Sequence, residues 1–223
     1  MRIIGDVHGN MDDYLSIASE AEMSIQVGDL GFDYSRLKRL NPKKHKFIGG
    51  NHDNYDLYED CPHAMGHWGL INDEMQLKRK EKFWFMRGAF SINAADFLVD
   101  YAHTGDMNWW KEEELTDLQL DAAVYNYRLN RPDVVITHDC PKVIRDTFDD
   151  VGLIHSTWGW SADFYSRTQK ALQQMWNIHK PKLWIFGHWH RYVDTIIEGT
   201  RFICLNELEY TDLPDSWLNI SNS

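Results

Sequence analysis

The sequence contains few cysteines, and none of them form a C-x-x-C pair. Only three occur among 223 residues, at Cys61, Cys140 and Cys204. An odd number of widely separated cysteines excludes the disulfide framework of a small secreted domain and is typical of reduced thiols. We therefore expect a cytoplasmic protein.

Long apolar segments are also missing. No run approaches the roughly 20 consecutive apolar residues that a membrane-spanning helix requires, so we expect no membrane partner. Residues 2–4 already lead into a polar loop. We expect no secretory signal peptide ahead of this first strand.

Basic residues are scarce relative to acidic ones. The chain has 23 Lys and Arg against 34 Asp and Glu, a formal net charge of −11. Nucleic-acid-binding surfaces need basic stripes that displace counterions, so this balance argues against a general nucleic-acid partner. It does not exclude an acidic metal site that acts on a phosphate ester, because divalent cations would offset the ligand carboxylates.

What the sequence does contain is enough apolar material for one core. Hydrophobic residues make up 43% of the chain, and the length predicts a single domain over residues 1–223. Short apolar runs alternate with amphipathic segments, which predicts an α/β fold. The expected strands are 1–4, 24–27, 46–48, 133–136 and 183–186, one or two strands in 83–90, and a closing hairpin of 193–197 and 202–206. The expected helices are 11–22, a short helix that ends with 37–40, 109–129 and 161–179. Segments 63–77, 102–110 and 142–160 have turn or loop character, the last as a possible lid, and the tail from Asp212 is expected to fray.

Several expected strands end in residues of the types that bind metals. The clearest case is Gly187-His188-Trp189-His190, directly after the apolar run 183–186. In an extended chain, residues i and i+2 point the same way, so the two imidazoles face one point. In open α/β sheets, ligands gather at the carboxyl ends of strands. The strand-end residues of this kind are Asp6, His8, Asp29, Asn51, His52, His138, His188 and His190.

This set combines two carboxylates, one amide and five imidazoles. Such a mixture suits Mn²⁺, Fe or Zn²⁺ better than Mg²⁺ or Ca²⁺, which prefer oxygen ligands. The set is too large for one tetrahedral ion and large enough for two. Single residues have simpler explanations: Asp6 as a helix N-cap, Asn51 as a turn residue, His138 as a structural loop residue. These explanations do not account for the repetition along the chain.

Five motifs of the chain resemble the signature of the calcineurin-like metallophosphoesterase family, in the family's order. They are Gly5-Asp6-Val7-His8-Gly9, Gly28-Asp29, Gly50-Asn51-His52-Asp53, Thr137-His138 and Gly187-His188-Trp189-His190. Segments 87–92 and 109–113 look similar to bacterial and phage members. The resemblance implies a four-layer αββα sandwich, in which two packed mixed sheets are flanked by helices and the metals lie at the strand ends.

The resemblance also implies a role for each residue. Asp6, His8 and His190 would hold one ion. Asn51, His138 and His188 would hold the other. Asp29 would bridge two divalent ions, best matched by Mn²⁺. His52 would stand near the leaving-group oxygen, and Asp53, from its adjacency alone, would orient His52 or a ligand.

The implied activity is hydrolysis of phosphomonoesters or phosphodiesters, with a small or nucleotide-like substrate. Two ions about 3.5–4 Å apart would lower the pKa of a bridging water, and the resulting hydroxide would attack phosphorus while His52 protonates the departing alkoxide. A protein Ser/Thr phosphatase is disfavoured, because Gly28-Asp29-Leu30-Gly31-Phe32-Asp33-Tyr34 lacks the arginine of that branch and the third motif reads Asn-His-Asp instead of Asn-His-Glu.

Two alternatives remain open at this stage. A nuclease would need a basic channel, for which only local patches such as Lys78-Arg79-Lys80 are present. A non-catalytic interaction module is disfavoured because His52 and all the ligand residues are present. The tryptophans of 109–110 and 158–160 are interpreted as packing residues instead of a base-stacking platform. His67 and His103 are candidates to line the pocket.

Overall fold

The computed structural model describes residues 1–77, 79–161 and 163–213. Its strands are β1 (Arg2–Ile4), β2 (Ser24–Gln26), β3 (His45–Phe47), β4 (Trp68–Leu70), β5 (Phe83–Met86), β6 (Val134–Thr137), β7 (Leu183–Phe186), β8 (Val193–Ile197), β9 (Thr200–Cys204) and β10 (Tyr210–Asp212). Its helices are α1 (Met11–Ser19), η1 (Ser35–Arg39), α2 (Tyr55–Tyr58), α3 (Ile71–Glu74), α4 (Ala94–Thr104), η2 (Lys111–Glu113), α5 (Asp117–Asn130), α6 (Lys142–Arg145), α7 (Val151–Thr157) and α8 (Arg167–Ile178).

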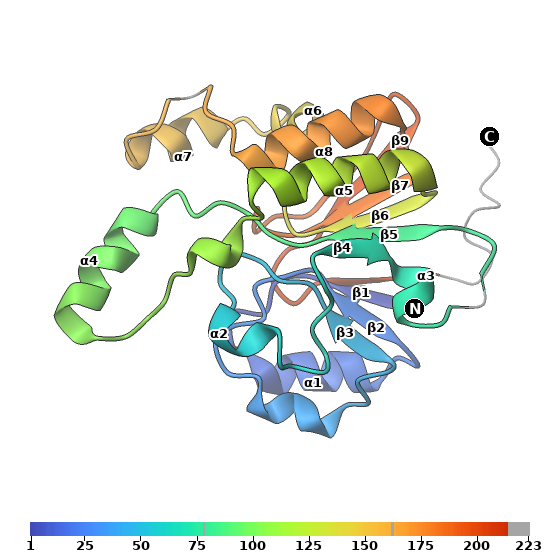
Figure 1. Ribbon diagram of the computed structural model, residues 1–223, viewed down its shortest axis with the longest axis horizontal. Helices are drawn as coiled ribbons and strands as arrows, with labels where there is room; N and C mark the ends of the chain where they lie inside the picture. Colours follow the sequence, from blue (N-terminus) through green and yellow to red (C-terminus); the bar gives the residue numbers. More distant parts are fainter. Residues whose placement is uncertain (78, 162, 214–223) are drawn as a thin grey trace.

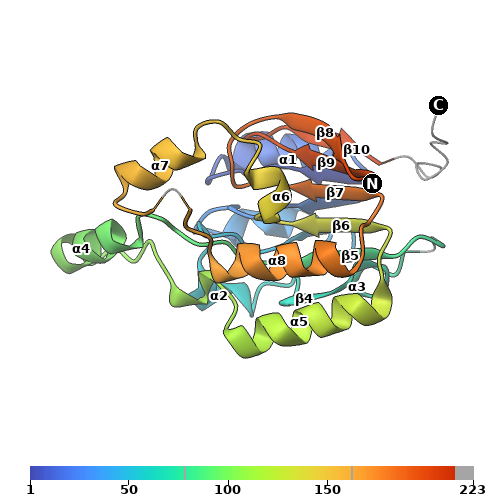
Figure 2. The same ribbon diagram turned by 90° about the horizontal axis from the view of Figure 1, so that it is seen from above.

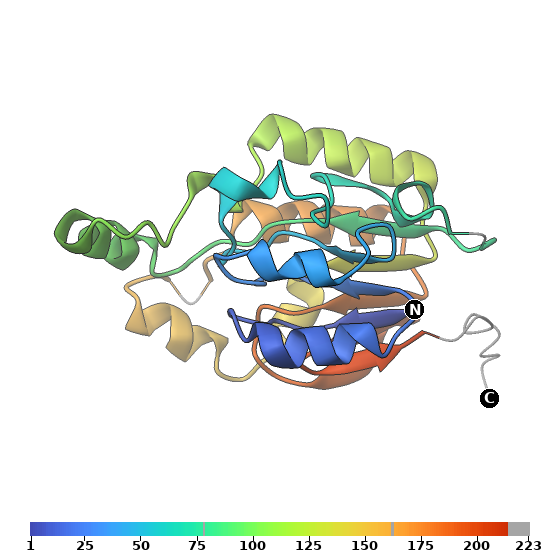
Figure 3. The same cartoon turned by 90° about the horizontal axis from the view of Figure 1, so that it is seen from below.

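The strands form two mixed sheets. One sheet has the order β10-β1-β2-β3 and the other has the order β4-β5-β6-β7-β9-β8. The central strands of each sheet are parallel, and antiparallel strands close the edges. The sheets lie face to face, with α5 and α8 covering the larger sheet and α1 covering the smaller one (Figure 1). Seen from below, α1 and η1 lie side by side across the smaller sheet (Figure 3). The expected αββα sandwich is therefore confirmed.

Three separate apolar clusters fill the spaces between these four layers. Strand β5 illustrates the division, because alternate side chains of a strand point to opposite faces. Phe83 and Phe85 belong to the cluster between the two sheets, whereas Trp84 and Met86 belong to the cluster beneath α5 and α8. The third cluster lies between the smaller sheet and α1. Because both faces of β5, β6 and β7 are covered, these strands have apolar sequences without polar alternation.

The succession β1-α1-β2-η1-β3 confirms the expected strand-helix-strand units, and β8 with β9 confirms the closing hairpin. Because β1, β2 and β3 are parallel, their carboxyl ends meet at one edge of the smaller sheet. The carboxyl ends of β5, β6 and β7 likewise share an edge of the larger sheet.

Several expectations were wrong in detail. Segment 63–77 contains the edge strand β4 and the short helix α3, and residues 102–104 belong to α4 instead of a loop. Segment 142–160 contains α6 and α7. The shortest of these elements, β4, α3 and α6, carry little periodic signal, because one turn of helix or three strand residues do not repeat a pattern. Helix α4 has eleven residues, so its length does not explain why it was not predicted.

The ends of two expected helices also differ. The helix predicted over 109–129 is split into η2 and α5, because Thr116 caps α5 through a reciprocal capping box with Gln119. The helix predicted over 161–179 begins at Arg167, where Ser166 and Gln169 form the same box. Asp212, where fraying was expected to begin, ends β10, which pairs with β1; the tail from residue 214 lies outside the described residues.

In the part of the chain that the structure describes, no helix combines the length and the apolar character needed to cross a bilayer. The three cysteine thiols are free, with Cys140 and Cys204 buried and Cys61 half-buried.

Candidate active site

The predicted metal ligands lie in the loops that follow five strands. Asp6 follows β1, Asp29 follows β2 and Asn51 follows β3, all in the smaller sheet. His8 also follows β1, whereas the other three ligands follow strands of the larger sheet: His138 after β6, and His188 and His190 after β7. The structure brings these residues together where the two sheets meet, from positions up to 184 residues apart in the chain.

The first group comprises Asp6, His8, Asp29 and His190, whose ligand atoms all lie within 4.8 Å of one another. His8 Nε2 lies 3.0 Å from His190 Nε2 and 3.8 Å from Asp29 Oδ2. His190 Nε2 lies 3.5 Å from Asp6 Oδ2. The two carboxylates are buried and the two imidazoles are exposed, so this group opens to solvent on its histidine side.

The second group comprises Asp29, His138 and His188, and it shares Asp29 with the first. His138 Nε2 lies 3.2 Å from Asp29 Oδ1 and 3.1 Å from Asn51 Oδ1. Asn51 therefore joins this group through its amide oxygen. The shared carboxylate is the feature that a bridge between two ions requires.

Both groups direct lone pairs toward a common centre. His138 Nδ1 lies 3.0 Å from the Val27 carbonyl oxygen; the proton belongs on Nδ1 there, since a carbonyl only accepts. Nε2 then faces two oxygen acceptors. The buried Asp29 Oδ2 has no hydrogen-bond partner among the residues that the structure describes. An arrangement of converging acceptors is stable only with a cation among them, so the residues present fit a metal centre.

The pKa values of the cluster also indicate that it requires a positive charge. Burial opposes a charged His138, yet the neighbouring Asp29 and Asp6 carboxylates outweigh it and raise the pKa of this imidazole to about 10. Burial likewise opposes a charged Asp29, but His138 holds the pKa of that carboxyl well below its usual range. A proton on His138 thus supplies the positive charge that a bound cation would supply.

The backbone at these positions is held in an unfavourable conformation. His8, Asp29, His188 and His190 all have positive φ, of 47°, 58°, 68° and 45°. Such residues cost about 1–3 kcal/mol each and persist only where surrounding contacts enforce them. Close packing adds a further constraint, because a Cβ atom at Gly187 would overlap the carboxylate of Asp6.

Asp53 helps to hold the backbone of Asp29 in its positive-φ conformation. Its buried carboxylate accepts hydrogen bonds from the backbone N–H groups of Asp29 at 2.9 Å, Leu30 at 3.1 Å and Gly50 at 2.7 Å. It also accepts one from the Tyr34 hydroxyl. Asp53 is therefore placed to hold the loop of Asp29, while its predicted alternative role of orienting His52 stays a prediction.

His52 lies at the edge of the two groups. Its backbone N–H donates to Asp29 Oδ1 at 2.7 Å, and the half-buried residue lines the pocket. The ring lies 5.4 Å from that of His8 and 5.6 Å from that of Phe97, measured between centroids. Phe97 belongs to α4, so this projecting helix reaches the site.

A buried chain of hydrogen bonds extends from Asn51, and it was not predicted from the sequence. The Asn51 amide nitrogen donates to Ser91 Oγ at 3.1 Å, and Ser91 Oγ donates to Glu113 at 2.7 Å. The Ser91 backbone N–H donates to the same carboxylate at 2.8 Å. This chain fixes the amide so that Oδ1 faces His138. The feature of the sequence that could have indicated it is the resemblance of segments 87–92 and 109–113, which contain Ser91 and Glu113, to members of the family.

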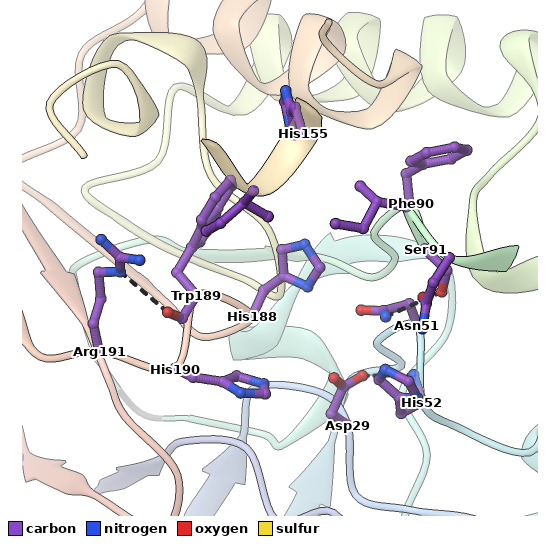
Figure 4. Close-up of a pocket in the computed structure, with 13 residues that line it drawn as sticks. Asp29, Asn51, His52, Phe90, Ser91, His155, His188, Trp189, His190 and Arg191 are labelled. Atoms are coloured by element: carbon purple, nitrogen blue, oxygen red, sulfur yellow. Dashed lines mark hydrogen bonds between the residues drawn. The ribbon is translucent and has the colours of Figure 1, made fainter. Parts of the chain in front are cut away.

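A cavity of about 300 Å³ opens beside the ligand groups. Figure 4 shows Asp29, Asn51, His52 and His190 on one side, with Phe90, His155 and Trp189 on the other. His155 lines this cavity, whereas the two outlying histidines considered from sequence, His67 and His103, are not among its lining residues.

The simpler explanations of single residues can now be compared with their contacts. Asn10, not Asp6, is the N-cap of α1, and Asp6 accepts the His188 backbone N–H at 2.9 Å. Among the tryptophans, Trp110 is buried against Phe32. Trp158 is 43% exposed, so only part of the tryptophan-rich segments packs in the interior.

Known proteins are similar to this chain over most of its length. The family model described as calcineurin-like phosphoesterase matches residues 2–192. No curated protein sequence matches the chain significantly. Among solved structures, the Phosphopantetheinyl Hydrolase from Mycobacterium tuberculosis aligns over 92% of this chain and 89% of its own, with 15% identity and a TM-score of 0.52.

A protein from Thermotoga maritima, whose solution NMR structure is known, aligns over 96% of this chain and 92% of its own, with 17% identity and a TM-score of 0.39. At such identities, the mycobacterial structure shows a common fold and nothing more specific. The family match carries the assignment, because it spans every strand-end motif from Asp6 to His190. The chain belongs to the calcineurin-like phosphoesterase family.

Proposed function

We propose that this protein is a dinuclear metal-dependent hydrolase of phosphomonoesters, phosphodiesters or both, acting on a small or nucleotide-like substrate. The observation that carries the proposal is that two groups of potential ligands, which lie close together at the junction of the sheets, share the single carboxylate of Asp29. Family membership supports phosphoester hydrolysis in general. The bacterial or phage subtype stays a prediction.

Each ion would have its own ligand set. Asp6, His8, Asp29 and His190 would hold one ion, and Asp29, Asn51, His138 and His188 the other. The mixed oxygen and nitrogen donors suit Mn²⁺ best, with Fe and Zn²⁺ as alternatives. When bound, the pair of ions would lower the pKa of the water between them and neutralise charge on the phosphoryl group.

The chain's own residues complete the chemistry. The Val27 carbonyl keeps the His138 proton on Nδ1, so Nε2 stays available to the site. Asp53 holds the strained loop of Asp29 in place. His52, at the pocket edge, would donate a proton to the leaving-group oxygen as the phosphorus–oxygen bond breaks. These are the roles expected of a hydrolase that activates water at neutral pH.

The competing functions are less well supported. A nuclease needs cations along its substrate path, and the guanidinium that lines the pocket, Arg191, already forms two hydrogen bonds with Asp150. Lys78, part of the basic patch considered from sequence, lies outside the described residues. A non-catalytic module has no need for four ligand residues at positive φ.

The test compares 4-nitrophenyl phosphate with bis(4-nitrophenyl) phosphate, using protein loaded in turn with Mn²⁺, Fe²⁺, Zn²⁺ and Mg²⁺. We expect hydrolysis with Mn²⁺, and the ratio of the two rates separates monoesterase from diesterase. Elemental analysis should find two ions per chain. Hydrolysis with none of these metals, or a single bound ion, would contradict the proposal. Incubation with single-stranded and duplex DNA examines the nuclease alternative.

A matched pair of variants locates the activity. Asp29→Asn should abolish hydrolysis and reduce metal content, because it weakens the shared ligand. Asp33→Asn changes an exposed carboxylate in the same loop, which accepts hydrogen bonds from Ser35, and should behave as the wild type.

A cytoplasmic location is part of the same proposal. It is supported by the three free thiols, since unpaired cysteines are typical of reducing compartments.

A further inference from the structure

The cavity beside the ligand groups has an apolar side. We define the apolar wall as Phe90, Ile92, Ile154 and Trp189, all of which line the cavity and are half-buried. Of these residues, Phe90 and Trp189 lie across the cavity from Asp29 and His52, on the side to which His155 also belongs (Figure 4). A phosphoryl group held by the predicted ligands would therefore place its ester substituent beside apolar side chains instead of solvent.

The wall is braced by contacts that do not involve the ligand groups. The Phe90 ring packs against Trp160 at 5.1 Å and against Phe164 at 5.2 Å, between centroids. The Trp160 indole N–H donates to the Ile92 carbonyl at 2.8 Å. Aromatic packing of this kind fixes the surface before a ligand arrives, which lowers the entropy cost of binding.

Trp189, another residue of the apolar wall, is also held by a hydrogen bond and by aromatic packing. Its indole N–H donates to Asp139 at 3.1 Å, and its ring packs on Phe148 at 5.2 Å. Since Trp189 lies between His188 and His190, the ligand-bearing loop itself contributes part of the wall. The apolar surface is thus continuous with the metal-ligating residues.

The charges of the cavity complement this surface. Among the described residues that line it, Arg191 carries the only guanidinium or ammonium group. Asp150 engages that group with hydrogen bonds of 3.0 and 2.8 Å, and the guanidinium also stacks on Phe148 at 4.7 Å. A second phosphate or another anionic group on the substrate would therefore find no uncompensated cation here.

We propose that the apolar wall binds the alcohol portion of the substrate, so that the preferred substrates are phosphate esters of apolar alcohols. This inference rests on the proposed function and narrows it to a substrate class. A cavity of about 300 Å³ is at the small end of ligand pockets, which fits a phosphoryl group with one ring or a short alkyl chain.

The first test measures phosphate release from ethyl, hexyl and glycerol phosphates by the Mn²⁺-loaded protein. All three have aliphatic leaving groups, so differences in kcat/KM report mainly on binding of the alcohol. We expect hexyl phosphate to exceed ethyl and glycerol phosphates by about tenfold or more, the discrimination that added methylenes give in an apolar pocket. Equal values, or a preference for glycerol phosphate, would overturn the inference.

A second test does not depend on turnover. Hexylphosphonate and methylphosphonate cannot be hydrolysed, and their affinities can be compared by calorimetry. The hexyl compound should bind about tenfold or more tightly. Equal affinities would overturn the inference even if no ester is hydrolysed.

Variants connect the preference to the wall. Ile154→Asn should reduce the ratio of hexylphosphonate to methylphosphonate affinity toward one. Leu153→Asn alters the neighbouring residue of α7, which is 71% exposed and outside the wall, and should preserve the ratio. Ile92→Asn provides a second wall variant on a different segment. A ratio unchanged in both wall variants would contradict the assigned surface.

The two proposals fail in different ways. If 4-nitrophenyl phosphate is hydrolysed but alkyl length has no effect, the apolar wall is wrong and the proposed function stands. If no phosphate ester is hydrolysed with any metal, the proposed function fails, and the phosphonate affinities still decide whether the wall binds apolar groups.

Discussion

Asp29 combines several unusual properties in one residue. Its backbone has a φ of 58°, and one carboxylate oxygen accepts the His52 backbone N–H. The other oxygen is buried and forms no hydrogen bond with any described part of the chain. Its own N–H is held by Asp53. Contacts with neighbouring residues therefore stabilise the strained backbone of Asp29, and this conformation directs a carboxylate oxygen toward the centre of the site.

His52 should affect turnover without affecting metal binding. Its ring lies outside both ligand groups, and general acid catalysis contributes about 10²–10⁴-fold to a rate. We expect His52→Ala to lower kcat by that range while elemental analysis finds the wild-type metal content. His103→Ala, at an exposed histidine of α4, serves as the control. Near-normal turnover in His52→Ala would refute the leaving-group role.

Glu113 should make stability depend on pH. Burial raises the pKa of Glu113 from its usual 4.5 to about 7. Between these values the native state retains a proton that the unfolded chain has lost, so the free energy of unfolding falls as pH rises. The full shift corresponds to about 3 kcal/mol at most.

Urea denaturation of metal-free protein between pH 4.5 and 7 measures this effect. The Glu113→Gln variant should show a shallower decline than the wild type, because an amide does not titrate. Glu112→Gln, at the exposed neighbouring position, should retain the wild-type slope. Identical slopes in all three proteins would show that Glu113 does not contribute.

At the scale of elements, the contrast is between the packed sandwich and the helices that project from it. Seen from above, α4 and α7 extend from the same end of the molecule (Figure 2). Helix α8 buries six of its twelve residues, whereas α4 buries none. Helical stability comes mainly from packing an apolar face, so α4 should be among the least stable elements.

Limited proteolysis with thermolysin measures this difference directly. The first cuts should fall within residues 94–107, where Leu98, Val99 and Met107 are exposed, because local unfolding is least costly there. Mass spectrometry of the early fragments identifies the sites. First cuts within α8 or α5 would contradict the expectation.

At the scale of the whole molecule, the site lies where the two sheets meet. Asp6, Asp29 and Asn51 follow strands of the smaller sheet, and the histidines after β6 and β7 follow strands of the larger one. Ions bound by both sets would connect the two sheets across their apolar interface. Metal binding should therefore stabilise the whole fold, and not one loop alone.

Thermal unfolding with and without metal tests this connection. At a free Mn²⁺ concentration of 100 times Kd, the native state gains about 2.7 kcal/mol, which for a domain of this size raises Tm by roughly 5–10 °C. Asp29→Asn should lose most of the increase. An unchanged Tm in the wild type would indicate that Mn²⁺ is not bound at the junction of the sheets.

Local patterns in the sequence determined a large part of this description. The apolar run 183–186 before Gly187 predicted its strand, because a strand buried on both faces needs an uninterrupted apolar sequence. The strands before Gly5 and Gly28 were predicted from shorter segments that also contain polar residues, such as Arg2, Ser24 and Gln26. The residues after those strands identified the family and the candidate ligands. The short elements β4, α3 and α7 were missed, because they are stabilised by what they pack against and carry no clear periodic pattern of their own. Helix α4 was missed as well, although it has eleven residues.

Only the tertiary structure decided which side chains meet. The sharing of Asp29 between two groups, the clamp formed by Asp53, and the hydrogen-bonded chain from Asn51 through Ser91 to Glu113 join residues from separate segments. The apolar wall likewise combines the loop after β5, helix α7 and the loop after β7. A local pattern specifies how each segment folds, whereas these contacts depend on the order and register of strands in two sheets, which are set by the packing of the whole chain.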